Sequence, residues 1–283
     1  MIIIRFQGGL GNQMFQYALF KRFQCLGREV KADLSFYDEN TAHNGFEIKR
    51  VFGLSLPKAS KEEIERLKDT NKFLRRYRRF FNIGWKKTDV QQVLFDYKDD
   101  IFKLDDAYLD GYWQSEKFFE PIIPGIKEDF KINLEDENNK GMAALIESSN
   151  SVSIHIRGTD FEKDKLLGGI STADYYKKAI ELLRTKVDNP VFFVFSDDFE
   201  YAKKIINEPV VDMNKGNDSY KDLILMSLCK HNIMANSSFS WWGAWLNDNP
   251  NKIVICPEKW VNLKRLDSSD IIPERWIRCK RCK

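Results

Sequence analysis

Residues 151–160 read Ser-Val-Ser-Ile-His-Ile-Arg-Gly-Thr-Asp, and this stretch decides the fold. As a strand it alternates, so that Val152, Ile154 and Ile156 share one face while polar side chains occupy the other. The glycine that follows Arg157 releases the chain into a polar loop. A strand that ends in this way is typical of a parallel sheet whose ligand binds at the carboxyl edge.

Strand and helix signals alternate outward from this stretch. Continuous apolar runs predict buried strands, and amphipathic patterns predict the helices between them. In the C-terminal half we expect strands at 191–195, 231–235 and 252–256, and helices at 172–186, 200–206, 220–230 and 239–247. Further upstream we expect strands at 2–6 and within 108–113, and helices at 12–26 and 60–68. The pattern predicts a doubly wound α/β architecture.

The composition is that of a globular chain with two domains. Its 283 residues carry 45 Lys and Arg against 42 Asp and Glu, a formal net charge of +3, and 43% of them are hydrophobic. We place the domains at 1–145 and 146–283, because the polar stretch 134–141 lies between the two patterned halves. A charge this close to neutral argues against nucleic-acid binding, which normally shows as a basic excess or a basic face.

No address label or membrane span is visible in the sequence. The longest apolar runs are far shorter than the ~20 residues that cross a bilayer, so we expect a cytoplasmic protein. A basic-aromatic stretch at 72–81 leaves two interpretations open. It is either an ordinary packed helix or a peripheral contact with the inner face of a membrane through Lys72, Arg75, Arg76 and Arg79.

Cysteine and carboxylate spacing argues against a bound metal. The C-x-x-C formed by Cys279 and Cys282 lacks the second ligand pair that zinc needs, and we expect incidental thiols in a frayed tail. No Asp-x-Asp triplet occurs, so the usual carboxylate pair for a nucleotide-bound divalent cation is missing. We expect neither a metal nor a cofactor.

A glycine loop follows the first strand, with the sequence Gln7-Gly8-Gly9-Leu10-Gly11-Asn12-Gln13. Its glycines let a ligand approach main-chain N–H groups at a helix N-terminus, where the helix dipole favours anions. The dinucleotide fingerprint G-x-G-x-x-G is incomplete because its third glycine is absent. The loop is therefore either a bare turn or a binding loop to which two amide side chains contribute.

Polar side chains follow two later strands. Arg157 presents a planar fork that suits a diphosphate, and Asp160 is placed to hold the fork, although a structural ion pair beside a buried His155 is the alternative. Ser196 and Asp197 end the next strand. They either cap the following helix or accept hydrogen bonds from a purine or a sugar hydroxyl.

A second candidate anion site follows the strand at 231–235. Here Asn236, Ser237, Ser238 and Phe239 precede or begin a helix, so that hydroxyls and main-chain amides converge. Ordinary N-capping accounts for only one serine. The tryptophans that follow, at 241, 242 and 245, are expected to pack this helix on the sheet.

These blocks together resemble the galactoside α-1,2-fucosyltransferases, glycosyltransferase family 11. The resemblance rests on Gly8 to Ala18, His155 to Phe161, Phe195 to Asp198 and Asn236 to Gly243, which occur in the family's order. It implies a GT-B-like α/β fold of two Rossmann-like domains facing a cleft, with an acceptor-side N-terminal domain and a C-terminal domain that binds GDP-fucose. It also implies inverting, metal-independent transfer of L-fucose from GDP-β-L-fucose to the 2-hydroxyl of a terminal β-galactoside.

The resemblance also implies roles for single residues. Arg157 would bind the diphosphate and stabilise departing GDP, with His155 and Asp160 in the same catalytic motif. The implied donor-binding residues are Gly9, Gly11, Asn12, Gln13, Ser196, Asp197, Asn236, Ser237, Ser238 and Phe239. The family often has two consecutive arginines where this chain has Arg157 and Gly158, which puts any role of a second arginine in doubt.

The base and the acceptor site are less defined. Candidate bases for the galactose hydroxyl are His155, Asp160 and Glu162, whereas an amide such as Asn12 could only orient that hydroxyl. Aromatic faces suit the apolar faces of sugar rings, so we expect the acceptor near three aromatic side chains, Trp85, Tyr112 and Trp113. A GDP-sugar transferase with another acceptor or linkage, and a nucleotide-sugar-binding protein without turnover, remain alternatives.

Overall fold

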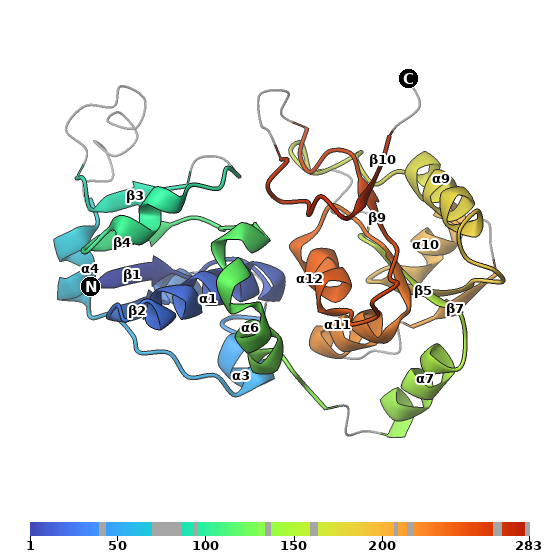
Figure 1. The fold of residues 1–283 in the computed structure, drawn as a ribbon, viewed down its shortest axis with the longest axis horizontal. Coiled ribbons are helices and arrows are strands. Elements are labelled where there is room, and N and C mark those ends of the chain that lie inside the picture. Colours follow the sequence, from blue (N-terminus) through green and yellow to red (C-terminus); the bar gives the residue numbers. More distant parts are fainter. Residues whose placement is uncertain are drawn as a thin grey trace. The chain divides into compact units, whose positions relative to one another are not determined.

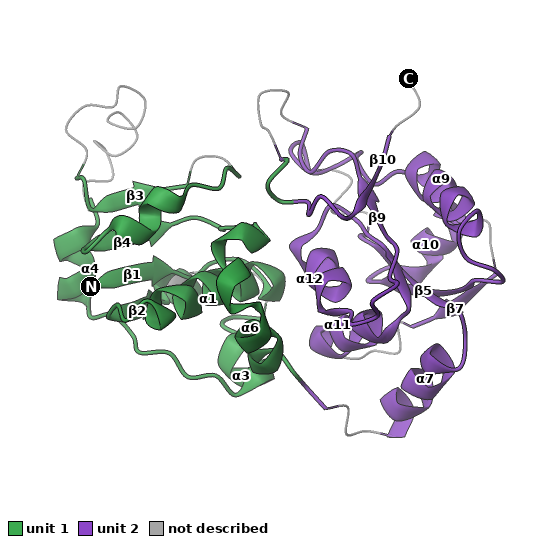
Figure 2. Ribbon diagram, viewed as in Figure 1, with its two compact units in different colours: residues 1–131, 269–271 green, residues 132–268, 272–283 purple. Residues whose placement is uncertain are grey.

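A computed structural model describes residues 1–39, 44–69, 86–92, 95–133, 137–158, 164–206, 209–213, 218–262 and 268–280. Within them the chain forms two compact units, each built on its own parallel sheet (Figure 1). Unit 1 comprises Met1–Lys131 with Ser269–Ile271, and unit 2 comprises Ile132–Ser268 with Ile272–Lys283 (Figure 2). Two successive Rossmann-like units confirm the predicted GT-B-like α/β fold, while the predicted cleft stays a prediction.

The boundary between the units differs from the predicted one. The division follows Lys131, whereas the expected boundary after residue 145 falls inside helix α7 (Glu137–Glu147). This helix buries Ile146 and packs against helix α11 (Ser219–Leu228) of unit 2. Packing of that apolar residue, and not the polarity of the preceding stretch, decides to which unit the helix belongs.

Unit 1 has a four-stranded sheet in the order β2-β1-β4-β3, and its strand pairs are parallel. Its elements are β1 (Ile2–Arg5), α1 (Leu10–Cys25), β2 (Val30–Asp33), α2 (Ser35–Glu39), α3 (Ile48–Phe52), α4 (Lys61–Leu67), β3 (Asp89–Gln91), η1 (Asp99–Lys103), β4 (Ala107–Asp110), η2 (Glu116–Phe118), η3 (Glu120–Ile122) and α6 (Ile123–Asp129).

Helices bury the sheet of unit 1. Ile3 packs with Leu67 of α4 and Tyr108 of β4 on one face, and α1 contacts β1 and β2. The start of α4 is fixed by a capping box, in which Ser60 Oγ accepts the N–H of Glu63 at 3.2 Å and the Glu63 carboxylate accepts the N–H of Ser60 at 2.8 Å.

Unit 2 has a six-stranded sheet in the order β10-β9-β8-β5-β6-β7, again with parallel pairs. Besides α7 and α11, its elements are β5 (Ser151–Ile156), α9 (Ala173–Arg184), β6 (Val191–Ser196), α10 (Phe199–Ile205), β7 (Val210–Asp212), β8 (His231–Ile233), α12 (Ser238–Leu246), β9 (Val254–Pro257) and β10 (Ile277–Cys279).

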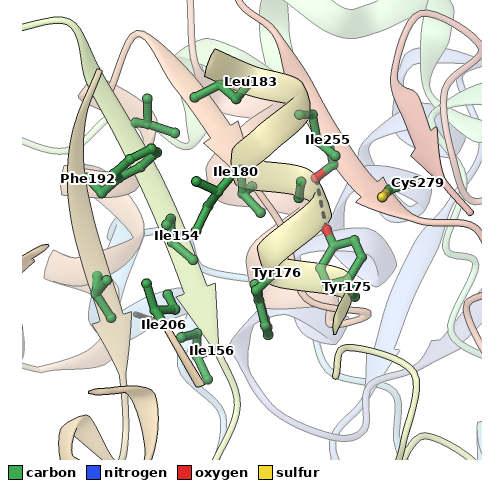
Figure 3. Close-up of a cluster of buried hydrophobic side chains, with 14 of the residues drawn as sticks. Ile154, Ile156, Tyr175, Tyr176, Ile180, Leu183, Phe192, Ile206, Ile255 and Cys279 are labelled. Atoms are coloured by element: carbon green, nitrogen blue, oxygen red, sulfur yellow. Dashed lines mark hydrogen bonds between the residues drawn. The ribbon is translucent and has the colours of Figure 1, made fainter. Parts of the chain in front are cut away.

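The two faces of β5 differ as its alternation predicts. Val152, Ile154 and Ile156 belong to the apolar cluster that α9 and α10 cover (Figure 3). In this cluster the hydroxyl of Tyr175 on α9 donates to the main-chain oxygen of Ile255 at 3.2 Å, which ties the helix to β9. On the opposite face of β5, His155 contacts Ser240 of α12, and Ser153 accepts from Asn232 of β8, which also donates to Met226 of α11.

Two predictions about packing have different outcomes. Trp241, Trp242 and Trp245 of α12 are at most 3% exposed and contact one another, which confirms their role in the core. The prediction of a frayed tail is wrong at Cys279, because β10 pairs with β9 and buries this thiol in the cluster of Figure 3. Cys282 lies outside the described residues.

Candidate functional site

Three of the predicted polar loops meet at one edge of the unit 2 sheet. The strands β6 and β8 both pair with β5, with Ile156 opposite Ser196 and Ile154 opposite Ile233. Because the strands are parallel, the loops after all three leave from the same edge. The residues that follow Ile156, Ser196 and Ile233 are the ones predicted to bind a donor.

Asp197 holds the loop that carries Arg157. The N–H of Gly158 donates to Asp197 Oδ1 at 2.7 Å, and Arg157 Nη1 lies 3.7 Å from Asp197 Oδ2. A Cβ atom at residue 158 would lie 2.7 Å from Asp197 Oδ1, so only glycine admits this approach. The predicted partner of the arginine, Asp160, lies outside the described residues. Asp197 is thus a partner that sequence reasoning did not assign to the arginine.

His155 is a buried, neutral imidazole at this edge. Burial, with a smaller effect from the charge of Arg157, lowers the pKa of His155 to about 3. Its Nδ1 lies 3.1 Å from the hydroxyl of Ser240, which accepts the N–H of Ala235 at 3.0 Å. Ser240 can donate its hydroxyl hydrogen to Nδ1, and we propose this tautomer, in which the ring proton lies on Nε2. A histidine with so low a pKa is a poor general base near neutral pH.

The start of α12 presents hydroxyls and main-chain amides that the helix does not use. Ser237 stands at the N-cap in an extended conformation, yet its side chain makes no capping hydrogen bond. Ser238 and Phe239 follow in the first turn, where N–H groups have no partner within the helix. All three residues are half-buried, and the ring of Phe239 lies 5.6 Å from that of His155. This is the arrangement expected of an anion cradle.

Two other predicted donor-binding residues support the loops from within. The side chain of Asn236, 1% exposed, accepts from the hydroxyl of Ser171 and donates to the main-chain oxygens of Leu167 and Trp260. The hydroxyl of Ser196 is bonded to the N–H and the oxygen of Asp198. We therefore propose that Asn236 and Ser196 position this edge without themselves contacting a donor.

The helix cap predicted at Ser196 or Asp197 lies one residue further on. Asp198 caps α10, because its carboxylate accepts the N–H of Tyr201 at 2.9 Å. The prediction for this cap is wrong because the hydroxyl of Ser196 already bonds to the main chain of Asp198 in the turn before the helix. Asp197 does not cap α10, and its carboxylate instead contacts the loop of Arg157 and Gly158.

The glycine loop of unit 1 is fixed by the side chain of Gln13. Gln13, fully buried, donates to the main-chain oxygens of Gly8 and Gly45 and accepts the N–H of Glu47. Gly8 has φ of +78°, and a Cβ there would lie 2.6 Å from Asn12 Nδ2. The amide of Gln13 is thus used within the protein, which favours a positioning role over donor contact.

The other residues predicted in this loop have different exposures. Gly9 is half-buried and stands at the N-cap of α1, whereas Gly11 is buried inside that helix. Asn12 is half-buried, and its Oδ1 accepts from Gln114 at 2.7 Å. Of the four donor-binding residues predicted in the glycine loop, Gly9 and Asn12 are therefore the two that are accessible to a ligand.

The comparison with known proteins decides the family. The family model "Glycosyl transferase family 11" matches residues 1–280, nearly the whole chain. The chain belongs to glycosyltransferase family 11. The resemblance seen in the four sequence blocks is confirmed, and the protein is a glycosyltransferase.

Curated relatives of this family 11 protein carry different names. It is 34% identical over 293 residues to an alpha-1,2-colitosyltransferase of Escherichia coli, with 99% of both chains covered. It is 32% identical over 280 residues to the O-antigen biosynthesis glycosyltransferase WbnK of Escherichia coli, which covers 89% of this chain and 92% of that protein. The mouse galactoside 2-alpha-L-fucosyltransferase Sec1 is 24% identical over 261 residues, covering 87% of this chain and 64% of that protein.

The aromatic residues predicted to bind the acceptor of this family 11 enzyme separate into three cases. Tyr112 is 41% exposed and follows the carboxyl end of β4. Trp113 is 3% exposed and packs edge-on against Phe118, so its expected role as an open sugar platform is not supported. Trp85 lies outside the described residues.

The remaining predicted positions also fall outside the described ranges. They are the candidate base Glu162 and the candidate membrane-contact residues Lys72, Arg75, Arg76 and Arg79. Over the part of the chain that the structure does describe, none of the helices combines the length and the apolar character needed to span a bilayer.

Sequence reasoning missed two glutamines that build the edge of unit 1. Gln16, fully buried, accepts the N–H of Gln7 and donates to the main-chain oxygen of Gly111. Gln92 Oε1 accepts the N–H groups of both Tyr112 and Trp113, at 3.1 and 2.6 Å. Gln16 lies within a family block, which was a usable signal, whereas no local pattern distinguishes Gln92.

Proposed function

We propose that this protein transfers a 6-deoxyhexose from its GDP-activated form to the 2-hydroxyl of a β-galactoside, with inversion and without a metal ion. The observation that carries the proposal is the edge of unit 2. There Arg157, the buried neutral His155 and the start of α12 lie at the ends of two strands that pair with each other. Positive charge and N–H donors of this kind suit a diphosphate.

These groups match what an inverting displacement requires. The acceptor oxygen forms a bond to the anomeric carbon while the bond from that carbon to the β-phosphate oxygen breaks. The proton of the acceptor hydroxyl passes to a base, for which Asp160 and Glu162 are the candidates. Negative charge grows on the departing GDP, and preorganised donors at that point lower the barrier. Arg157 supplies a full positive charge, and the first turn of α12 supplies main-chain N–H groups. We assign the N–H at Nε2 of His155 to the same anion as a neutral donor.

Two donor sugars are candidates. L-Fucose is favoured by the resemblance in the sequence blocks and by the mouse relative. L-Colitose is favoured by a bacterial relative that matches 99% of this chain and is named a colitosyltransferase. Colitose is fucose without its 3-hydroxyl, so the enzyme distinguishes them by one polar group. A site built to bond that hydroxyl rejects the deoxy sugar by up to ~10⁴-fold.

Incubation with each GDP-sugar and methyl β-D-galactoside, in EDTA, tests the proposal. We expect transfer from one of the two donors, with an α-1,2 linkage shown by NMR of the product. Arg157→Ala should lower turnover at least ~100-fold, while loss of its pair with Asp197 lowers the melting temperature by no more than about 3 °C. Loss of transfer in EDTA would contradict the metal-free mechanism. Binding of GDP without transfer from either sugar would favour the alternative of a binding protein and overturn the proposal.

A further inference from the structure

Polar side chains also gather at the carboxyl edge of the unit 1 sheet, where no role is assigned to them. Arg5 ends β1, and its Nη1 donates to Oδ2 of Asp110 at the end of β4, at 3.0 Å. Gln7 and Gln91 donate to the same carboxylate at 3.3 and 3.4 Å. Side chains from β1, from the glycine loop and from β3 therefore meet on one carboxylate.

This edge is reachable by a ligand. The side chain of Arg5 is 25% exposed and that of Asp110 is 9% exposed, while Gln7 and Gln91 are half-buried. Two residues beyond Asp110, Tyr112 is 41% exposed. The cluster is thus neither sealed in the core nor a freely solvated surface pair.

The backbone after β4 is strained at Trp113 and is fixed at Tyr112 and Trp113 by the side chain of Gln92. Trp113 has φ of +55°, a left-handed conformation that costs a non-glycine residue about 1–3 kcal/mol. The amide oxygen of Gln92 accepts the N–H groups of Tyr112 and Trp113 and so maintains it. At Gly111 a Cβ would lie 2.5 Å from the Cβ of Gln92, which leaves room only for glycine. Trp113 is itself buried, but backbone strain of this kind clusters at ligand-binding sites.

Among the described residues, the charge of this edge disfavours a diphosphate as its ligand. Asp110 neutralises Arg5, Asp33 ends β2, and Asp89, the first residue of β3, accepts a hydrogen bond from Gln91. Lys68 offsets only part of these carboxylate charges, with its Nζ 3.9 Å from Asp33. Counted over the described residues, the local charge is therefore neutral to negative, in contrast to Arg157 and the α12 N-terminus of unit 2. Carboxylate, guanidinium and amide groups together suit an uncharged ligand with many hydroxyls.

We propose that Arg5, Asp110 and Gln91, with the ring face of Tyr112, form the binding site for the hydroxyl groups of the sugar acceptor. The proposal rests on the function proposed above and names the residues that select its second substrate. Asp110 accepts hydrogen bonds from sugar hydroxyls, and Arg5 donates to sugar oxygens. The amide nitrogen of Gln91 donates to Asp89 and Asp110, so this residue keeps the carboxylate in place, while its amide oxygen accepts from a sugar hydroxyl. Tyr112 covers an apolar ring face.

Stability alone does not explain this cluster. A partly exposed ion pair contributes about 0–1 kcal/mol, and removing a charged pair from water frequently offsets that gain. Four polar side chains from four segments, beside a strained Trp113, exceed what a structural pair needs. Binding of a polar ligand, whose hydroxyl groups replace the water around these side chains, explains why they gather here.

Kinetics with methyl β-D-galactoside test the assignment. Asp110→Asn keeps the size of the side chain and should raise the acceptor KM at least ~10-fold, because it removes a charged hydrogen-bond acceptor. Tyr112→Ala should raise it about 3-fold or more through lost ring contact, and because this residue is exposed, the variant is expected to fold. The donor KM should change by less than about 2-fold in both. Asp105→Asn, whose side chain is 86% exposed in the same unit, is the matched control.

Two results would overturn the assignment: unchanged acceptor KM in the folded variants, or an equal rise in the KM of the donor. Saturation-transfer NMR with the same galactoside keeps the test independent of turnover. If the unaltered enzyme transfers no sugar, the proposed function fails, yet a galactoside signal that Asp110→Asn or Tyr112→Ala abolishes still supports the site. An undiminished signal in these variants refutes it, and so does the absence of any signal with the unaltered protein.

Discussion

The clearest prediction concerns a single methyl group at Gly158. In Gly158→Ala the new Cβ would lie 2.7 Å from Asp197 Oδ1 and 3.3 Å from its Cγ, closer than any stable contact. The obstructing atom is the end of a side chain that is 47% exposed, so Asp197 rotates away at little strain. This movement breaks the hydrogen bond from the N–H of residue 158 and separates Asp197 from Arg157.

The size of the effect follows from these two contacts. The hydrogen bond to Asp197 contributes about 1 kcal/mol, and the half-exposed pair with Arg157 adds about 0.2–1 kcal/mol. The free energy of unfolding should therefore fall by roughly 1–2 kcal/mol, which lowers the melting temperature of the chain by about 2–6 °C. The same energy restrained the arginine, so kcat/KM for the GDP-sugar should fall about 10-fold.

Calorimetric GDP titration, donor kinetics and a melting curve measure this prediction. Gly141→Ala is the matched control, because residue 141 lies in α7 of the same unit and an added Cβ meets nothing within 4 Å. It should leave activity unchanged and raise stability by up to about 1 kcal/mol. Wild-type GDP affinity and kcat/KM in Gly158→Ala would refute the idea that Asp197 holds the arginine loop.

Three further predictions address the same edge of unit 2. Burial lowers the pKa of His155 to about 3, whereas in the unfolded chain the imidazole keeps its ordinary pKa. Between these two pKa values the unfolded state therefore binds one more proton than the folded state. The free energy of unfolding should fall by up to about 1.4 kcal/mol per pH unit as the pH drops from about 6.5 toward 3. Urea unfolding at pH 7 and pH 5 should show this slope reduced in His155→Gln. Ser237→Ala should weaken GDP binding and lower the free energy of unfolding by less than about 0.5 kcal/mol, because this side chain makes no capping hydrogen bond. As a control, Thr172→Ala removes the side chain that caps α9, and it should lower the free energy of unfolding by about 1 kcal/mol without changing the affinity for GDP. Asn236→Ala should lower the unfolding free energy by about 2–4 kcal/mol in denaturant titration, since it leaves buried main-chain oxygens without a donor.

The central strands were predictable because their side chains carry a strong local signal. The strand expected at 151–157 is β5, and its alternating faces are those of Val152 and His155 in the structure. Short strands were not predicted: β3 reads Asp-Val-Gln and β10 reads Ile-Arg-Cys, too few residues for a period to show. Pairing with β4 and β9 makes them strands, and that is tertiary information.

The candidate site divides in the same way. Arg157 and the serines before α12 were recognisable because a charged or hydroxyl residue directly after a buried strand is a local signal. The role of Asn236 was not, because its partners Leu167 and Trp260 lie 69 and 24 residues away in the chain. Gln92 likewise acts on a loop 20 residues distant. Residues that position a site depend on which loops meet, and sequence spacing does not contain that information.

The glycine loop and the start of α12 show why charge, more than motif shape, separates the two substrates. Both follow a parallel strand and open a helix, and the loop at Gly8 looks more like a phosphate-binding sequence. In the structure, however, the oxygen of Gly8 accepts from Gln13, and the edge beside the loop is neutral to negative because Asp110 pairs with Arg5. The start of α12 has unused hydroxyls and stands at the same sheet edge as Arg157. We therefore propose that a diphosphate binds at the second of these edges and an uncharged sugar at the first.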